Sequence, residues 1–407
     1  MITLVSLLGI VVFFSIAFLF SANRNRINWR TVGFAFLAQF ALGCIALYLP
    51  LGIAALQVIS NAISSVLGNA QDGIEFVFGP IGAFEMGFIF AFHVLPVVVF
   101  FSSLVTVLYH LGVMGWIIKV IGGALRWLLH TSKAESMSAT ANIFVGQTEA
   151  PLVVRPYIAS MTRSEIFAVM VGGMATVAGS VLAGYVLLGV ELRYLLAASF
   201  MAAPGGFLMA KLMMPETQVI KNEDESFHLE IEKHVNVIDA AAAGASSGMA
   251  LALNIGAMVL AFVGLIAVVN SILGWFGGLV GLDQLSLQLL LGYLFQPVAF
   301  VLGVPWAETN LAGSFIGQKL VFNEFVAYVA FTGQMDTMSA HTQAVVTFAL
   351  CGFANFSSIG ILLGGLGTMA PDRRSDIAQL GVRALTAGFL ANLMSAAIAG
   401  FFLSLSI

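Results

Sequence analysis

The sequence predicts an all-α polytopic membrane protein, on the strength of its composition, its apolar runs and the spacing of its polar clusters. Hydrophobic residues make up 60% of the 407 positions and charged residues only 9%, whereas about a quarter of an ordinary soluble domain is charged. Several apolar runs reach the roughly 20 residues that a helix needs to cross a bilayer. A barrel would instead show alternating strands of about 10 residues. We expect about eight transmembrane helices and two opposed re-entrant hairpins in an inverted repeat, with interfacial helices.

The apolar segments give the expected elements. We expect helices near residues 2–21, 31–50, 88–110, 165–189, 192–213, 246–274, 343–368 and 379–405, and interrupted apolar stretches at 111–131, 138–160, 285–304 and 312–335. Basic residues and two tryptophans, Trp116 and Trp127, mark the stretch 111–137. Such anchors favour a helix that lies along the membrane surface rather than through it.

Positive charge sets the expected orientation. The arginines of residues 22–30 follow the first apolar run, which lacks the basic start of a signal peptide. Because basic loops stay in the cytoplasm, we expect the N-terminus outside. The arginine-rich turn at 372–383 and the charged stretch 217–239 are also assigned to the cytoplasm. The prediction is a multi-pass protein in the lipid bilayer of the cell's inner (plasma) membrane, with both termini outside.

Polar clusters recur along the chain at a nearly constant offset. Glu149 and Glu324 are 175 positions apart, and Thr176 and Asn355 are 179 apart. The charge signs require a hairpin at 138–160 that opens to the cytoplasm and one at 312–335 that opens to the outside, as in the inverted repeats of secondary transporters. We therefore divide the chain into N-terminal scaffold helices with an external segment (1–80), a first repeat (81–213), a cytoplasmic charged linker (214–240) and a second repeat (241–407).

The first hairpin carries the sequence NIFVGQTEAPLVVRP at 142–156. Gly146 and Pro151 should unwind it there, and unwound backbone at membrane depth is tolerated only where protein buries it or a wet cavity receives it. Freed carbonyls and the side chain of Asn142 are suitable ligands for a hard cation. A carboxylate at the bilayer centre costs about 2.5–3.5 kcal/mol on the translocon scale, so Glu149 needs a partner or a function. A salt bridge to Arg155 is the structural alternative.

The second hairpin carries KLVFNEFVAYVAF at 319–331, where Asn323 and Glu324 are adjacent within apolar flanks. A charge there indicates a function more than packing. Glu308, beside Pro305 and Trp306, is a weaker candidate, because a turn at the membrane interface explains it equally well.

Two apolar helices are interrupted by polar residues. In GGMATVAGSVLAGY (172–185), the small residues suit close helix packing, and the hydroxyls of Thr176 and Ser180 suit hydrogen bonds back to their own helix. Equally, Thr176 and the carbonyl of Val177 would complete a sodium site that faces Asn142. In CGFANFSSIGILLGGLG (351–367), Asn355 and Ser358 are three residues apart and share a helix face. They suit hydroxyl binding beside Phe353, with polar contacts between helices as the alternative.

Other classes of site are not supported. The six histidines and two cysteines lack metal-ligand spacing, no phosphate-binding loop is present, and nothing predicts a nucleic-acid partner. An ion channel and a membrane-embedded enzyme using Glu149 and Glu324 as an acid–base pair are alternatives. A channel would need a continuous polar path, whereas the polar groups cluster at two hairpins and two broken helices.

The motifs GQTEAP, NEFVAY and GFANFSSI resemble those of the concentrative nucleoside transporters, and the resemblance extends over nearly the whole chain. It is most similar to the bacterial sodium-coupled members. The resemblance implies a homotrimer whose protomers act independently, and a secondary active transporter that imports nucleosides such as uridine by symport with sodium through alternating access. No cofactor is expected besides sodium as the coupling ion, and no catalytic residue.

Carried over position by position, the resemblance assigns roles to twelve residues. It gives the nucleobase to Gln147, Thr148, Glu149 and Val181, the ribose hydroxyls to Glu324, Asn355 and Ser358 with Phe353 packing nearby, and sodium to Asn142, Val145, Thr176 and Val177. A closely similar bacterial member has Ser where Thr176 stands here. Proton-coupled relatives tend to lose the equivalent of Asn142, so its presence favours sodium, and a proton-coupled nucleoside symporter is the alternative.

Overall fold

The computed structural model describes residues 2–218, 229–230, 234–279, 281–282 and 284–405. Within these ranges all regular secondary structure is helical. Eight helical stretches of the described chain are long and apolar enough to cross a membrane, judged by length and composition. Positions 219–228 and 231–233 of the expected charged linker lie outside the described residues.

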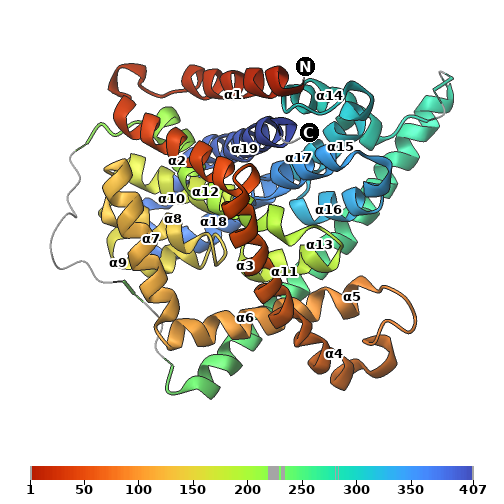
Figure 1. Ribbon diagram of the computed structural model, residues 1–407, viewed down its shortest axis with the longest axis horizontal. Coiled ribbons are helices and arrows are strands. Elements are labelled where there is room, and N and C mark those ends of the chain that lie inside the picture. The colour runs from red at the N-terminus through yellow and green to blue at the C-terminus, as the bar shows by residue number, and fades with distance from the viewer. Residues whose placement is uncertain (1, 219–228, 231–233, 280, 283, 406–407) are drawn as a thin grey trace.

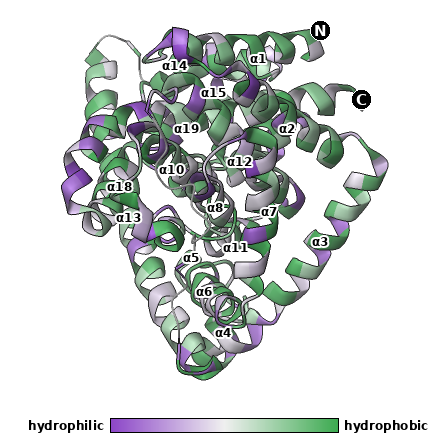
Figure 2. Ribbon diagram, turned by 90° about the vertical axis from the view of Figure 1, so that its left-hand side faces the viewer, coloured by the Kyte–Doolittle hydropathy of each residue, from purple (hydrophilic) through white to green (hydrophobic). Residues whose placement is uncertain are grey.

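The N-terminal part contains more helix than the sequence indicated. It comprises α1 (Ile2–Leu19), η1 (Arg24–Arg26), α2 (Trp29–Leu47), α3 (Pro50–Gly68), α4 (Ala70–Phe78) and η2 (Gly79–Ile81). The expected external segment thus contains α3, which begins with Pro50 in its first turn, where a proline is well tolerated. Figure 2 shows α3 running apart from the main body, and only 17% of the apolar window in Pro50–Ile81 is buried within the chain.

The rest of the chain forms two series of helices. The first is α5 (Phe90–His93), α6 (Leu95–His110), α7 (Val113–Leu129), α8 (Lys133–Ala141), η3 (Ala150–Val154), α9 (Arg155–Ile158), α10 (Arg163–Ala175), α11 (Gly179–Leu187) and α12 (Leu192–Met213). The second is α13 (Val237–Leu279), α14 (Leu287–Val301), η4 (Trp306–Glu308), α15 (Thr309–Val321), α16 (Glu324–Thr332), η5 (Met335–Thr337), α17 (Ala340–Leu350), α18 (Phe356–Met369), η6 (Pro371–Arg373) and α19 (Arg374–Leu405). Figure 1 shows both series wound around a common centre.

Three expected helices are divided. The stretch 88–110 breaks at Val94, because Pro96 sits in the first turn of α6. The stretch 165–189 breaks at 176–178, and 343–368 breaks at 351–355, so the last is two short helices rather than one span. Conversely, 246–274 is the middle of α13, which has 43 residues.

The two series pack in the same way. Helix α7 packs on α8 as α14 packs on α15, and α10 packs on α12 as α17 packs on α19. The segment α8–α9 folds back on itself through η3, and α15 folds back on α16. We name these hairpin 1 (133–158) and hairpin 2 (309–332). Each is followed by a broken helix, α10–α11 or α17–α18.

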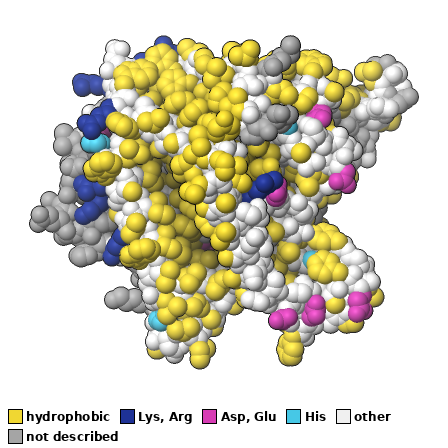
Figure 3. Space-filling model, viewed as in Figure 1, with side chains coloured by type: hydrophobic (Ala, Val, Ile, Leu, Met, Phe, Trp, Pro, Cys, Tyr) yellow, Lys and Arg dark blue, Asp and Glu magenta, His cyan; other side chains and the backbone are white. Residues whose placement is uncertain are grey.

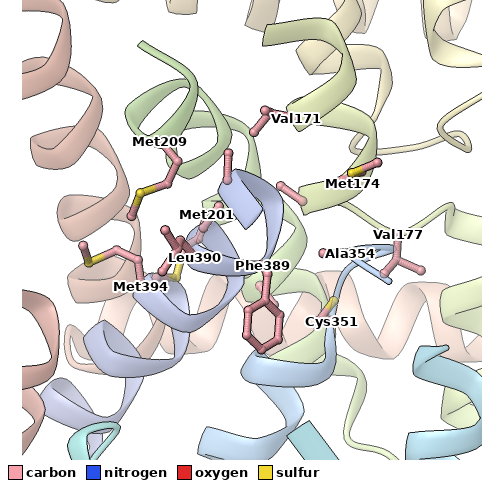
Figure 4. Close-up of a cluster of buried hydrophobic side chains, with 14 of the residues drawn as sticks. Val171, Met174, Val177, Met201, Met209, Cys351, Ala354, Phe389, Leu390 and Met394 are labelled. Carbon is pink, nitrogen blue, oxygen red and sulfur yellow. The ribbon is translucent and has the colours of Figure 1, made fainter. Parts of the chain in front are cut away.

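The core lies among α10, α12, α17 and α19. All residues of α10 after Arg163 are buried. Figure 4 shows Met201, Met209 and Met394 near one another in a cluster of buried hydrophobic side chains that also includes Met174. Methionine suits such a core because its unbranched side chain fills irregular gaps. The breaks of both broken helices are fixed beside this core.

Polar residues begin and anchor these helices. Ser132 caps α8, and Thr162 with Glu165 forms a capping box on α10. Lys211 of α12 forms a buried ion pair with Glu135 of α8 at 2.7 Å. Since breaking a buried pair costs several kcal/mol, this contact fixes hairpin 1 to α12.

Candidate functional site

The tip of hairpin 1 is irregular, as Gly146 and Pro151 predict. Helix α8 ends at Ala141, and the chain turns without regular helix until η3 begins at Ala150. The Glu149 carboxylate accepts a hydrogen bond from the Gly146 N–H at 3.0 Å. The alternative salt bridge to Arg155 is absent from the ion pairs of the described chain. Glu149 is therefore directed at its own hairpin tip.

Hairpin 2 places a buried carboxylate at the start of a helix. Asn323 caps α16 by accepting from the Val326 N–H at 2.8 Å, which makes Glu324 the first helical residue. One Glu324 oxygen accepts from the Tyr185 hydroxyl at 3.2 Å, and the other accepts from the Asn355 amide at 3.0 Å. A carboxylate at a helix N-terminus is favoured by the helix dipole.

The break before α18 connects the two hairpins. Asn355 caps α18 by accepting from the Ser358 N–H at 3.0 Å. From hairpin 1, the Gln147 amide donates to the Ser358 hydroxyl at 3.2 Å, while its carbonyl oxygen is buried without a partner in the described chain. The two broken helices also meet directly, because the Phe353 N–H donates to the Thr176 carbonyl at 3.0 Å.

All eight residues that the sequence assigns to nucleoside binding line one cavity of about 120 Å³. It is bounded by hairpin 1, hairpin 2, the start of α11 and the start of α18. Three apolar side chains of α13, Leu251, Ile255 and Met258, close the opposite wall. The cavity thus combines amide, carboxylate, hydroxyl and aromatic groups from the hairpins and broken helices with an aliphatic wall from α13. This arrangement suits a small neutral ligand with hydroxyl groups and a flat ring.

Two of the four residues assigned to sodium, Asn142 and Thr176, lie against the same residue of α10, Gly172. Asn142 is fully buried, its amide nitrogen donates to the Ser138 carbonyl at 3.1 Å, and its side-chain oxygen has no partner in the described chain. The Thr176 hydroxyl bonds back to the carbonyl of Gly172, the same glycine whose missing side chain would lie 3.3 Å from the Asn142 amide nitrogen.

The backbone completes this oxygen-rich group. The Gly179 N–H donates to the Phe144 carbonyl at 2.9 Å and so fixes the tip of hairpin 1 to the α10–α11 break. No donor of the described chain reaches the carbonyls of Val145 and Val177. A hard cation prefers such oxygen ligands, so the donor set fits sodium. No group of three His, Cys, Asp or Glu side chains that would suit another metal occurs in the described ranges.

Sequence reasoning missed two contributions to the site. Tyr185, which bonds to Glu324, is the last residue of the stretch 172–185. The interpretation of that stretch rests on Thr176, Val177 and the small residues, although a buried tyrosine hydroxyl is expected to have a partner. The wall from α13 consists of ordinary aliphatic residues, which only the fold brings to the cavity. Glu308, the weaker candidate, does not line the cavity. It accepts from the backbone and hydroxyl of Ser339 at 3.2 and 2.9 Å, as its interpretation as a turn residue predicts.

The glycines of 172–185 do allow close packing, and Gly173 gives a testable case. A Cβ there would lie 2.8 Å from the Cβ of Gln147 and push the tip of hairpin 1 outward. Overpacking costs about 1–3 kcal/mol, so we expect Gly173→Ala to weaken nucleoside binding by roughly tenfold or more. Gly206→Ala is the matched control, since its nearest contact would be 3.7 Å. Equal nucleoside binding by both variants would contradict the inference that Gln147 packs closely against Gly173.

Comparisons with known proteins point to one family. The family model for the C-terminus of Na⁺-dependent nucleoside transporters matches residues 194–400, and the model for their N-terminus matches residues 8–81. A third model, described as a gate for nucleoside recognition, matches residues 91–191. The nucleoside permease NupC of Helicobacter pylori is 49% identical over 99% of each chain.

The chain belongs to the concentrative nucleoside transporter family. An uncharacterized transporter of Haemophilus influenzae is 56% identical to it over 98% of both chains. Solute carrier family 28 member 3 of rat is 41% identical, and the match covers 98% of this chain and 58% of the rat protein. This transporter is therefore a membrane-embedded nucleoside transporter, of a family of permeases rather than enzymes.

Solved structures show the same fold. The structure of CNTnw in an inward-facing substrate-bound state is 56% identical to this transporter, with a TM-score of 0.96, and covers 100% of this chain and 99% of its own. A substituted form of CNTnw in an outward-facing state has the same identity, coverage and TM-score. The expected all-helical transporter fold is confirmed by this match.

Proposed function

We propose that this transporter imports nucleosides by symport with sodium, through alternating access. The observation that carries the proposal is the buried, unpartnered side-chain oxygen of Asn142 in the hairpin that also lines the cavity. A buried polar atom without a partner costs about 1–3 kcal/mol. A cation held there, by Asn142, Val145, Thr176 and Val177, removes that cost.

We assign the nucleoside to the cavity between the hairpins. Gln147, Thr148 and Glu149, with Val181 beside them, would receive the nucleobase. Glu324, Asn355 and Ser358 would bind the ribose hydroxyls, with Phe353 packing nearby. The existing hydrogen bonds from Tyr185 and Asn355 to Glu324 hold its carboxylate in place for this role.

Coupling follows from the shared hairpin. Asn142 and Val145 precede Gln147, Thr148 and Glu149 by a few residues on one irregular segment. A cation that orders this segment also places the nucleobase ligands, so sodium raises nucleoside affinity. By reciprocity, a nucleoside raises sodium affinity by the same factor.

The fold supports alternating access. The two series of helices and their hairpins suit an inverted repeat of hairpins that enter the membrane from opposite sides, with boundaries near 81–213 and 241–407. The relative CNTnw has been solved in inward-facing and outward-facing states. We also propose a homotrimer, in which residues 1–80 contribute scaffold surface. Helix α3, which lies apart from the body, has the exposed apolar side chains that such an assembly needs.

Charge distribution supports the proposed orientation in the cell's inner membrane. Figure 3 shows basic side chains gathered mainly along the left of the view and acidic ones on the right. In Figure 1, α1 runs from the N-terminus toward the basic side. The two termini are adjacent, since Ser404 donates to the Thr3 hydroxyl at 2.9 Å. Under the positive-inside rule, this charge distribution supports the proposal that both termini lie outside and the linker 214–240 lies in the cytoplasm.

A competition experiment tests the substrate class. Purified transporter in liposomes would take up labelled uridine under an inward sodium gradient, with unlabelled uridine, adenosine, uracil or uridine monophosphate as competitor. We expect at least one further nucleoside to compete and the monophosphate not to, because Glu149 and Glu324 line the cavity and repel a phosphate. Competition by the monophosphate as strong as that by uridine would contradict the proposed site.

The alternative, a proton-coupled symporter, would use a carboxylate of the cavity, Glu149 or Glu324, to carry the proton. Glu324 is a buried group that is able to carry a proton, whereas the amide and backbone oxygens around Asn142 are not. Sodium is favoured because this amide oxygen lacks a hydrogen-bond donor in the described chain.

A further inference from the structure

Hairpin 2 buries the side chain of a lysine, Lys319, among carbonyl and amide groups. Lys319 of α15 is fully buried, with no exposed surface. Its ammonium donates to the Ala349 carbonyl at 2.8 Å and to the Asn392 side-chain oxygen at 2.7 Å, and it lies 5.7 Å from the centre of the Phe389 ring. None of the ion pairs found in the described ranges involves Lys319. A buried charge without a carboxylate partner needs another source of stabilisation.

Lys319 contacts the end of one broken helix directly and reaches the end of the other through Asn392 of α19. Ala349 lies in the last turn of α17. The Asn392 amide nitrogen donates to the carbonyl of Cys351, which follows α17, at 2.9 Å, and to the carbonyl of Ala175, the last residue of α10, at 2.6 Å. The C-terminus of a helix carries roughly half a negative elementary charge. The Lys319 ammonium and the Asn392 amide therefore donate hydrogen bonds to carbonyls at or next to the negative C-terminal ends of α17 and α10.

Two glycines allow the close packing of α19 against the ends of the broken helices. A Cβ at Gly352 would lie 2.3 Å from the Asn392 side-chain oxygen, so only glycine leaves room for Asn392 beside the α17–α18 break. A Cβ at Gly388 would lie 2.7 Å from the Cβ of Met174, so α19 approaches the end of α10 closely as well. Figure 4 shows Cys351, Phe389 and Met174 around this point.

The position matches that of the proposed sodium site in the first series. There, hairpin 1 supplies Asn142, and the break that follows α10 supplies Thr176 and Val177. Here, hairpin 2 supplies Lys319, the last turn of α17 supplies the Ala349 carbonyl, and α19 supplies the Asn392 side-chain oxygen. The two positions are also connected, because Ala175 precedes Thr176 and the Thr176 carbonyl accepts from the Phe353 N–H of the second break.

We propose that the Lys319 ammonium is a tethered cation that holds the second repeat as sodium holds the first, so that each transport cycle requires only one mobile ion. Lys319 is a positioning residue in this account. It acts through Asn392 and the two helix ends on Thr176 and Phe353, and it does not touch the nucleoside. The inference rests on the proposed sodium-coupled function.

The test compares Lys319→Ala and Lys319→Gln with the original protein, all purified in detergent and high sodium. Lys319→Ala leaves space and bare carbonyl oxygens, whereas Lys319→Gln keeps a hydrogen-bond donor without the charge. Gln318→Ala is the matched control, because Gln318 is a buried neighbour that donates only to Ser314 of its own helix. Melting temperature without nucleoside is measured in sodium and in choline, and nucleoside binding is measured as sodium is raised.

We expect Lys319→Ala to melt well below the original protein in choline and to recover most of the loss in sodium, since an ion that binds only the folded state stabilises it. Its nucleoside binding should need roughly tenfold more sodium and rise more steeply with it, as when a second ion binds. Lys319→Gln should bind nucleoside weakly even in high sodium, because its amide fills the site without charge. Gln318→Ala should keep the original sodium dependence.

Two outcomes would overturn the inference. One is unchanged sodium dependence of melting and binding in both Lys319 variants. The other is failure of both to fold in high sodium while Gln318→Ala folds, because the inference expects sodium to replace the ammonium in Lys319→Ala. If nucleoside binding by the original protein does not depend on sodium, the proposed symport is contradicted. The comparison of melting temperatures in sodium and choline would still decide the role of Lys319.

Discussion

Replacing Glu324 with glutamine should reduce nucleoside uptake by roughly a hundredfold or more. Both carboxylate oxygens already accept hydrogen bonds, from Tyr185 and from Asn355. An amide at this place turns one acceptor into a donor that faces another donor, and it removes the charge offered to the ribose hydroxyls. Hydrogen bonds to charged groups contribute about 1.5–3 kcal/mol each, and each 1.36 kcal/mol is a factor of about ten.

The measurement is initial uptake of uridine into liposomes that hold equal amounts of folded protein. Tyr185→Phe is the matched control, because it removes one donor and leaves the carboxylate intact. The Tyr185 hydroxyl supplies one of the two hydrogen bonds to the charged carboxylate. One such bond contributes about 1.5–3 kcal/mol, so this control should lose roughly tenfold, which is less than the loss expected for Glu324→Gln. Uptake and affinity of Glu324→Gln equal to those of the original protein would remove Glu324 from the site.

Replacing Asn142 with alanine should raise the sodium concentration for half-maximal uptake by roughly tenfold or more, while nucleoside affinity at saturating sodium changes little. The side-chain oxygen of Asn142 has no partner in the described chain, so its loss removes a cation ligand and breaks no hydrogen bond of that oxygen. A ligand worth about 1.4 kcal/mol accounts for a factor of ten. The measurement is uptake over a range of sodium concentrations, followed by a nucleoside titration at the highest one.

A neighbouring residue separates this effect from damage to α8. Thr140 is buried on the same helix, and its hydroxyl bonds back to the Ser136 carbonyl at 2.8 Å. Thr140→Ala should therefore leave the sodium dependence unchanged. A loss of nucleoside affinity at saturating sodium that equals the loss of sodium affinity would show that Asn142 supports the hairpin rather than the ion.

Much of the site was predictable because polar residues are rare in this chain. Against an apolar background, Gln147, Glu149, Glu324 and Asn355 stand out, and the cost of burying them indicates a shared cavity. The breaks at 176–178 and 351–355 were predictable for the same reason, since their polar side chains interrupt apolar helices.

The rest depended on three-dimensional packing. The sequence predicts an external segment where α3 lies, because polar residues and glycines dilute the apolar character of 50–81. The α13 wall of the cavity has no polar signal. The sequence alone does not predict the role of Lys319, because a lysine near a hairpin tip is usually exposed. Only the fold shows that Lys319 is buried beside the helix ends.

The most direct test of sodium-coupled nucleoside transport is uridine uptake into liposomes under two separate gradients. The first is an inward sodium gradient at equal pH, and the second is an inward proton gradient with sodium absent. We expect accumulation above equilibrium with sodium alone and none with protons alone. Accumulation driven only by protons would contradict the sodium site at Asn142 and Thr176 and would support the proton-coupled alternative.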